Sequence, residues 1–161
     1  LAGAIRSIKD LYWFIRPNLE FGTIEFRICD ALSTLNDTMA LVALIQCLVV
    51  FVSTKIENNA HEQLWSKEQQ WIAPENQWNV ARDGLEGIIT DSRGQRQKIS
   101  ESILQLVDEL SPTAKHLNCI EELQYINNIL VNGNGAQRQR NIFKERQSLR
   151  DVVNESINAI F

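Results

Sequence analysis

The sequence predicts an α+β protein that is predominantly helical and contains a small antiparallel sheet. Two patterns support this class. Strict alternation of apolar and polar residues is confined to short stretches, and most of the remaining chain carries apolar residues at the three- and four-residue spacing of helices. The 161 residues are 44% hydrophobic and 22% charged, which is typical of a folded domain with room for a core. We therefore expect a single domain.

The strand pattern is clearest in "FGTIEFRICD", residues 21–30. Ile24, Phe26 and Ile28 alternate with polar neighbours in this stretch. Successive side chains of a strand point to opposite faces, so the apolar and polar sets are separated. We expect the apolar face to anchor the strand on covering helices.

The polar face of the same strand is expected to present Glu25 and Arg27 in the open. An antiparallel partner is predicted in "LYWFIRP", residues 11–17, and "GIITD", residues 87–91, is a third strand candidate. Two or three strands are too few for an independent sheet of ordinary size. They would either form a flap on the helices or complete a larger sheet, and the start at Leu1 favours the second interpretation.

The most apolar run is "MALVALIQCLVVFV", residues 39–52. Its length of about 14 residues falls short of the roughly 20 that cross a bilayer, and no membrane segment is expected. A helix that is apolar all round is usually buried. We expect a buried central helix here.

Helical patterns follow it to the end of the chain. One helix is expected to stop at Pro74 and the next at residues 111–112, Ser-Pro. Asn118 with Glu121 resembles a capping box that opens a third, and "NGNG", residues 132–135, indicates a break before one last helical face. The apolar residues on these faces are Leu64, Trp65, Trp71 and Ile72; Ile99, Ile103, Leu106, Val107 and Leu110; Ile120, Leu123, Ile126 and Leu130; and Ile142, Phe143, Leu149, Val152, Val153, Ile157 and Ile160.

Composition excludes several classes of function. A net charge of −4 without a basic run argues against nucleic-acid binding. The three cysteines, Cys29, Cys47 and Cys119, are isolated and form neither a disulfide framework nor a metal-binding pair, which favours a reducing, cytoplasmic setting. His61 and His116 are also isolated, so no zinc-type cluster is predicted.

Glu25 and Arg27 have two interpretations. They could form a surface ion pair, which contributes little to stability. Alternatively they belong to a nucleotide site, in which the carboxylate binds Mg²⁺ and the guanidinium contacts phosphate oxygens. A strand holds its side chains in fixed positions, as such a site requires.

Other arginines have similarly open roles. Arg16 precedes a proline in an apolar segment and could simply cover apolar surface with its stem. Trp78 and Arg82 are four residues apart on a predicted helix, where a stacked cation–π contact is the simplest interpretation. Arg138 and Arg140, in "GNGAQRQR", follow a weak phosphate-loop pattern and would otherwise lie in a solvated first turn.

Together these segments resemble a known family. "YWFIRPNLEFGTIEFRICDA" at residues 12–31, "NQWNVARDGL" at 76–85 and "GNGAQRQR" at 133–140 are similar to the second half of the glutamate–cysteine ligase type 2 family. The first block is the most specific, and the resemblance runs from about Asp10 to the C-terminus. Gln77 stands where the family commonly has arginine.

The resemblance implies a glutamine-synthetase-like fold, in which a curved antiparallel sheet cradles the site and helices cover its back. It also implies ATP and Mg²⁺ as cofactors. In such ligases ATP phosphorylates a carboxylate, typically the γ-carboxylate of glutamate, and an amine such as that of cysteine displaces phosphate. Their catalysis is mostly electrostatic.

The resemblance also assigns roles to residues of this chain. For Asp30 it implies a structural or site-edge role without a specific assignment. The implied roles are catalysis by Arg27 and Glu25, Mg²⁺ binding by Glu25, ATP binding by Arg27 and Arg16, and substrate binding by Arg82, Trp78 and Asn76.

The family's first half carries a G-x-E-x-E type strand with further metal ligands, and no such pattern occurs here. We therefore expect residues 1–161 to be the C-terminal portion of a ligase catalytic domain, without its N-terminal half and inactive alone. The expected partners are small-molecule substrates, with a second copy of the chain as a further candidate, but neither nucleic acid nor membrane. The alternative is a non-catalytic helical assembly module that retains the ligase scaffold, and nucleotide dependence would distinguish the two.

Overall fold

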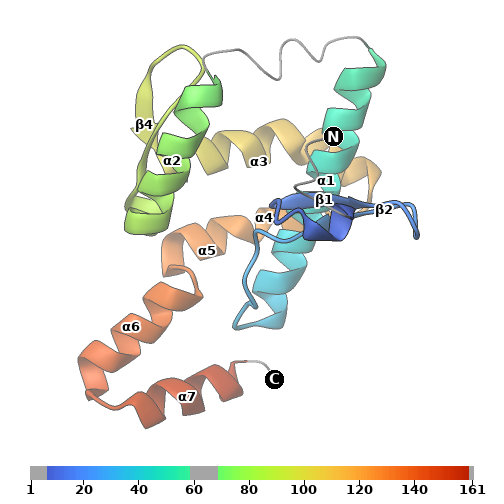
Figure 1. Cartoon of the computed structure of the whole chain (residues 1–161). Helices are drawn as coiled ribbons and strands as arrows, with labels where there is room; N and C mark the ends of the chain where they lie inside the picture. Colours follow the sequence, from blue (N-terminus) through green and yellow to red (C-terminus); the bar gives the residue numbers. More distant parts are fainter. Residues whose placement is uncertain (1–6, 59–68, 160–161) are drawn as a thin grey trace. The chain divides into compact units, whose positions relative to one another are not determined.

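The computed structural model describes residues 7–58 and 69–159, and most of these residues are helical (Figure 1). The predominantly helical α+β class is thereby confirmed. Chain contacts divide the protein into two compact units, Leu1–Leu32 and Ser33–Phe161. Each unit has its own organisation.

The first unit is built on a β-hairpin. A short 3₁₀ helix, η1 (Ile8–Asp10), precedes β1 (Ile15–Asn18) and β2 (Thr23–Phe26), which pair antiparallel as predicted. Gly22 supplies the positive φ of 62° that the connection requires.

The two faces of the hairpin separate as predicted, but the apolar face is not covered. Ile24 lies opposite Pro17 on this face, and Ile24 and Ile28 are 53% and 59% exposed. Phe26 alone of the three expected anchors is half-buried. The expectation that they fix the strand on covering helices is therefore wrong for both isoleucines. Two four-residue strands provide no second layer to bury them.

The apolar run of the sequence forms α1 (Leu35–Glu57), which begins after Thr34 because the Thr34 side chain accepts a hydrogen bond from the Asp37 N–H. The helix is confirmed, but its burial on all sides is wrong. Its buried residues, Asp37, Ala40, Ala43 and Cys47, form one stripe, while Met39 is 43% exposed. Small residues on the stripe let α1 approach its neighbours closely.

By length and composition α1 could cross a bilayer, since it has 23 residues and a window with mean hydropathy 2.2. It is thus longer than the apolar run suggested, and residues 7–58 and 69–159 contain one such helix. A mostly buried core helix of a globular protein meets the same criteria, and 17% of this window is buried. The buried stripe of α1 packs against two other helices, α3 and α4.

Those helices complete the core. They are α3 (Ile99–His116) and α4 (Ile120–Gln124), followed by α5 (Ile126–Asn132). The predicted end of α3 at the Ser-Pro pair is wrong, because the helix continues through Pro112 to His116. Leu110 and Ala114, on either side of the proline, have no exposed surface, and this burial offsets the lost backbone hydrogen bond. The core residues are Ala40, Ala43, Cys47, Val107, Leu110, Ala114, Leu123 and Ile126.

The predicted capping box at Asn118 is also wrong. Asn118 has a φ of 55° and closes α3 instead of opening α4. Its N–H donates to the Lys115 carbonyl at 3.3 Å, and the Cys119 N–H donates to the Ala114 carbonyl at 2.9 Å. These two bonds form a Schellman motif, in which asparagine is a tolerated left-handed residue.

A helix and a hairpin form the next part of the second unit. α2 (Gln69–Asp83) leads through the 3₁₀ helix η3 (Gly84–Glu86) into the antiparallel strands β3 (Ile88–Thr90) and β4 (Arg96–Lys98). Figure 1 shows α2 lying beside this hairpin. The strand at residues 87–91 is confirmed. The predicted stop at Pro74 is wrong, since α2 continues past it, and Leu64 and Trp65 lie outside the described residues.

The last two helices are α6 (Gly135–Arg146) and α7 (Leu149–Asn158), which pack against each other. The predicted break at residues 132–135 is confirmed. The single helical face expected after it is wrong, because Gln147 adopts a left-handed φ of 51° and Ser148 caps α7. The polar Gln-Ser pair thus turns the chain between two helices.

Candidate functional site

The first group of predicted site residues lies on the polar face of the β1–β2 hairpin. Arg16 stands directly opposite Glu25 in the strand register. The Arg16 Nε and Nη2 atoms lie 2.9 and 2.7 Å from Glu25 Oε2. Arg16 Nη1 also donates to the Lys9 carbonyl at 3.0 Å. The Arg16 guanidinium is therefore held in place and fixes one oxygen of the Glu25 carboxylate.

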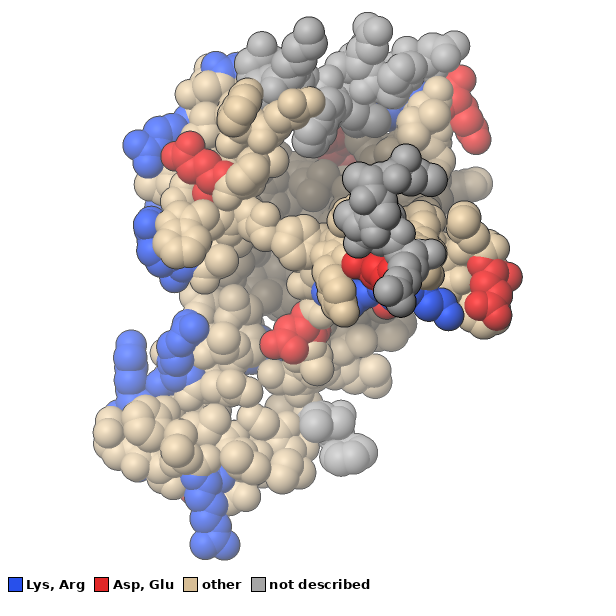
Figure 2. Space-filling model, viewed as in Figure 1, with Lys and Arg blue, Asp and Glu red and all other residues tan. Residues whose placement is uncertain are grey.

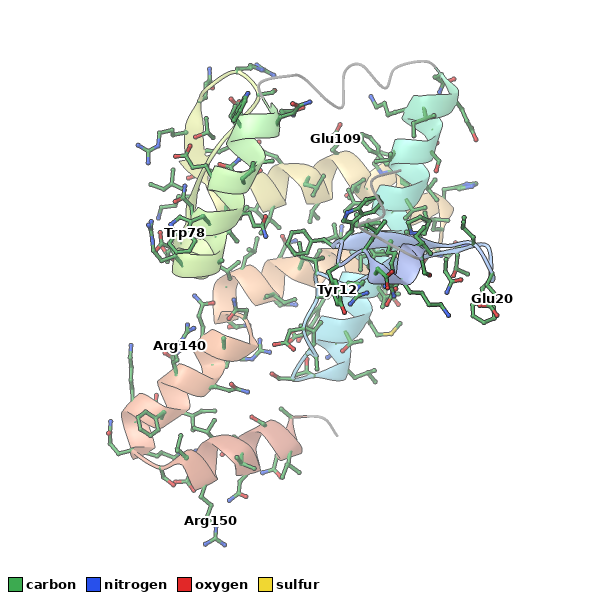
Figure 3. The ribbon with its side chains drawn as sticks, viewed as in Figure 1. Tyr12, Glu20, Trp78, Glu109, Arg140 and Arg150 are labelled. Atoms are coloured by element: carbon green, nitrogen blue, oxygen red, sulfur yellow. The ribbon has the colours of Figure 1, made fainter. Side chains whose placement is uncertain are left out.

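Arg27 continues the same face beyond the end of β2. Its N–H donates to the Phe14 carbonyl at 2.7 Å, which extends the strand pairing by one step. The Arg27 guanidinium lies 5.6 Å from the centre of the Tyr12 ring, a cation–π distance, and Tyr12 is labelled in Figure 3. The predicted surface ion pair is thus present at Glu25, but its partner is Arg16 rather than Arg27.

The hairpin face combines one carboxylate with two guanidinium groups. Glu25 is 45% exposed at its side chain, so the carboxylate remains accessible from solvent. No cluster of three or more His, Cys, Asp or Glu side chains able to hold a metal occurs in residues 7–58 and 69–159. Glu25 could supply one hard oxygen ligand to Mg²⁺, an ion that commonly keeps waters and substrate phosphates as its other ligands. Glu25 is a single such donor, and both contacts from Arg16 are to its Oε2 atom.

The second group lies on α2. Asn76 is tied to the adjacent strand, because its Nδ2 donates to the Thr90 carbonyl and its Oδ1 accepts from the Thr90 N–H, both at 2.8 Å. This amide thus bonds both backbone polar groups of Thr90, as a neighbouring strand would. Trp78 projects from α2 with 65% of its surface exposed (Figure 3).

Arg82, at the end of α2, pairs with its sequence neighbour Asp83. Its Nε and Nη2 atoms donate to the two Asp83 oxygens at 2.9 and 2.7 Å. The hydrogen bond from Arg82 lowers the pKa of Asp83, and the same bond raises the pKa of Arg82. A cation–π contact between Trp78 and Arg82 is not among the ring contacts of the described residues.

The structure therefore brings the predicted residues together in two groups. Arg16, Glu25 and Arg27 share one face of the first unit, and the three α2 residues belong to the second unit. Asp30 lies in the first unit, where its Oδ1 accepts a hydrogen bond from the Ala31 N–H at 2.8 Å.

One interaction was missed by sequence reasoning. Asp37, only 3% exposed, forms an ion pair with Arg138, which also donates from Nη1 to the Gly133 carbonyl at 2.7 Å. Arg138 is therefore not a solvated residue of the first turn, whereas Arg140 is exposed as expected. An acidic residue in the first turn of a highly apolar helix was the one available signal.

Helix α6, which carries Arg138, requires a glycine at its start. A Cβ added to Gly135 would lie 2.5 Å from Ser33 Oγ, so the beginning of α6 approaches the segment before α1 too closely for a side chain. The "GNGAQRQR" motif thus joins the starts of α6 and α1 through the glycine and Arg138.

Comparison with known proteins identifies the family of this chain. Residues 1–156 match the family described as "Glutamate-cysteine ligase family 2". A protein of Arthrobacter sp. named "Putative glutamate--cysteine ligase 2-1" is 40% identical over 94% of this chain and 39% of its own length. A Gloeobacter violaceus protein named "Putative glutamate--cysteine ligase 2" is 41% identical over 94% of this chain and 40% of its own length. The chain spans about two fifths of the length of these relatives, and it belongs to the glutamate–cysteine ligase family 2.

Proposed function

We propose that this chain contributes to an ATP-dependent ligase that joins a carboxylate to an amine through an acyl-phosphate. The carboxylate is typically the γ-carboxylate of glutamate, and the amine is one such as cysteine. Family membership over residues 1–156 carries this proposal. The polar hairpin face with Glu25, Arg16 and Arg27 supports it, because its charges suit a phosphoryl-transfer site.

The proposed fold of the whole protein is glutamine-synthetase-like. The β1–β2 hairpin would then be part of the larger curved sheet, with its polar face toward the site. This assignment accounts for the exposed apolar face of the hairpin, since Ile24 and Ile28 would be covered in the larger sheet structure.

Each hairpin residue has a distinct chemical role in this proposal. Mg²⁺, when bound, neutralises phosphate charge during transfer. Glu25 would hold it through the carboxylate, and Arg16 orients that carboxylate from the opposite strand. Arg27, whose guanidinium rests on the Tyr12 ring, would direct its N–H groups at the oxygens of the transferring phosphoryl group. The amine then attacks the activated carbonyl carbon, and phosphate leaves.

The α2 residues are proposed to bind the amino-acid substrates. Arg82 offers a guanidinium for a substrate carboxylate, although it would have to exchange or share its contact with Asp83. Trp78 offers an exposed ring face beside it on the helix. Asn76 would act indirectly, because its two hydrogen bonds to Thr90 hold α2 against β3.

The setting proposed for this activity is the cytoplasm, with small molecules as partners and a homo-oligomer as the candidate assembly. The acidic net charge of −4 supports the absence of nucleic acid from this list. The packing of the α1 stripe on α3 and α4 supports a core helix rather than a membrane span.

The test uses the complete gene product with Glu25→Gln, Arg27→Lys and Arg27→Ala substitutions. We expect each to lower kcat for ADP release by about 10²–10³-fold, because each removes one preorganised electrostatic contact. Arg27→Lys should be nearly as harmful as Arg27→Ala, since an ammonium cannot make two parallel contacts to phosphate oxygens. Glu25→Gln should also weaken the dependence on Mg²⁺.

Arg150→Lys is the matched control, because Arg150 projects away from α7 (Figure 3). Melting temperatures are measured for every variant, and they should change little because Glu25 and Arg27 are exposed. Full activity of Glu25→Gln, or a fall in Tm large enough to explain lost activity, would leave the Arg16–Glu25 pair as a structural ion pair.

A further inference from the structure

Two of the three cysteines lie together in the helical core of the second unit. The Sγ atoms of Cys47 and Cys119 are 3.7 Å apart, although the residues are 72 positions apart in the sequence. Cys47 has no exposed surface, and Cys119 is half-buried. The third, Cys29, is exposed in the first unit. Both thiols of the pair are free.

Local structure holds both thiols in position. Cys47 lies on the buried stripe of α1, one turn beyond Ala43, where α1 packs against α3 and α4. Cys119 immediately follows left-handed Asn118, and its N–H donates to the Ala114 carbonyl at 2.9 Å in the Schellman motif. The two sulfur atoms therefore face each other from rigid backbone segments rather than from loose loops.

We propose that Cys47 and Cys119 form an oxidisable thiol pair, at which a peroxide produces an intramolecular disulfide. In the first step the Cys119 sulfur attacks the peroxide O–O bond and becomes a sulfenic acid, while the departing oxygen takes up the thiol proton and leaves as water or an alcohol. In the second step Cys47 attacks that sulfur, a new S–S bond forms, and hydroxide leaves with the Cys47 proton as water. Two thiols are oxidised by two electrons, and the peroxide is reduced by two.

The order of these steps follows from the environments of the two sulfurs. Burial, together with the contact to Cys119, raises the pKa of the Cys47 thiol from 9.0 to about 11, so that Cys47 stays protonated at neutral pH. Cys119 has exposed surface and meets peroxide first. A disulfide bond is about 2.0 Å long, so the sulfurs must move together from 3.7 Å. A side-chain rotation can supply such a movement.

The cross-link has a measurable consequence for stability. It would join α1 to the residue before α4 and close a loop of 72 positions. Closing so long a loop restricts the unfolded chain strongly, and we expect the Tm to rise by about 5–15 °C on oxidation. This inference does not depend on the proposed ligase function.

The experiment uses the 161-residue chain with Cys29→Ala, which removes the exposed thiol and leaves the pair. The protein is treated with hydrogen peroxide, and thiols are counted after denaturation. Non-reducing tryptic digestion with mass spectrometry then locates any cross-link. We expect both thiols to disappear together, a Cys47–Cys119 peptide from monomeric protein, and the rise in Tm. Dithiothreitol should reverse all three changes.

The matched control is the double variant Cys29→Ala, Cys119→Ala, which retains the buried Cys47 alone. Its thiol should resist peroxide, and its Tm should not respond. The unchanged wild-type chain is mapped in parallel after additional cleavage before aspartate, because Cys29 and Cys47 share one tryptic peptide and Asp30 and Asp37 lie between them. The result then does not depend on the folding of either variant. Sulfinic acid at Cys119 without a cross-link, disulfides only between chains, or an unchanged thiol count would each overturn the proposal.

Discussion

At the scale of single residues, the ion pair between Asp37 and Arg138 connects positions 101 residues apart. The Asp37 side chain is 5% exposed and that of Arg138 29%, so the carboxylate depends on this partner. Arg138→Gln should lower the free energy of unfolding by about 1–3 kcal/mol, because a buried charge loses its charged hydrogen-bond donor. Urea denaturation measures this change.

Arg140→Gln is the control for that prediction, two positions further along the same helix. Arg140 is exposed, as Figure 3 shows, and it has no ion-pair partner in the part of the chain that the structure describes. The control should change stability by no more than about 0.5 kcal/mol. Equal losses in the two variants would show that Asp37 does not need Arg138.

Comparing two ion pairs explains what could be predicted from the sequence at this scale. Arg16 and Glu25 lie in neighbouring strands of a predicted hairpin, so their juxtaposition needs only the correct register. Asp37 and Arg138 meet because α1 and α6 begin at the same place, which no local pattern records. The contact between Cys47 and Cys119 was not predicted for the same reason, because it also depends on tertiary packing.

At the scale of elements, helix boundaries were the least predictable feature. Pro112 lacks the N–H of the helix ladder, yet α3 continues because Leu110 and Ala114 are fully buried on either side of it. Hydrophobic spacing predicted the helix itself correctly. Its end depends on tertiary packing against α1, which is absent from a local sequence window. The three-residue strand β4, "RQK", has no alternation to detect.

The turn between α6 and α7 permits a test with opposite expected signs. Gln147 has a φ of 51°, which glycine adopts without strain, so Gln147→Gly should raise the free energy of unfolding by about 0.5–1 kcal/mol. Gln139→Gly, inside α6, should lower it by about 1 kcal/mol, because glycine is a poor helix former. Thermal and urea unfolding measure both variants.

Two results would contradict this description of the turn. If both glycine variants lose stability equally, the left-handed conformation at Gln147 does not end α6. A large loss at Gln147 would instead indicate that its side chain is important, since Nε2 donates to the Lys144 carbonyl at 3.1 Å. The exposed basic side chains of the α6–α7 region, visible in Figure 2, are retained in both variants.

At the scale of the whole molecule, the number of candidate metal ligands limits the activity that we expect of this chain by itself. The chain spans about two fifths of the length of its relatives. Its two-stranded hairpin leaves Ile24 53% exposed, and the hairpin carries one candidate metal ligand, Glu25. Family membership could be recognised from motifs in the sequence, and the missing G-x-E-x-E type pattern led to the expectation of an incomplete site, which stays a prediction.

The purified 161-residue chain should therefore make no γ-glutamyl amide from ATP, glutamate and cysteine. The reason is the G-x-E-x-E type strand that the resemblance implies as a source of further metal ligands, because no such pattern occurs in this sequence and Glu25 is the one metal ligand expected here. ADP release and amide formation are measured side by side for this chain and for a complete family member. Activity in the complete protein alone agrees with a shared site. Robust turnover by the 161-residue chain, abolished by Glu25→Gln, would show instead that Glu25 and its neighbours suffice.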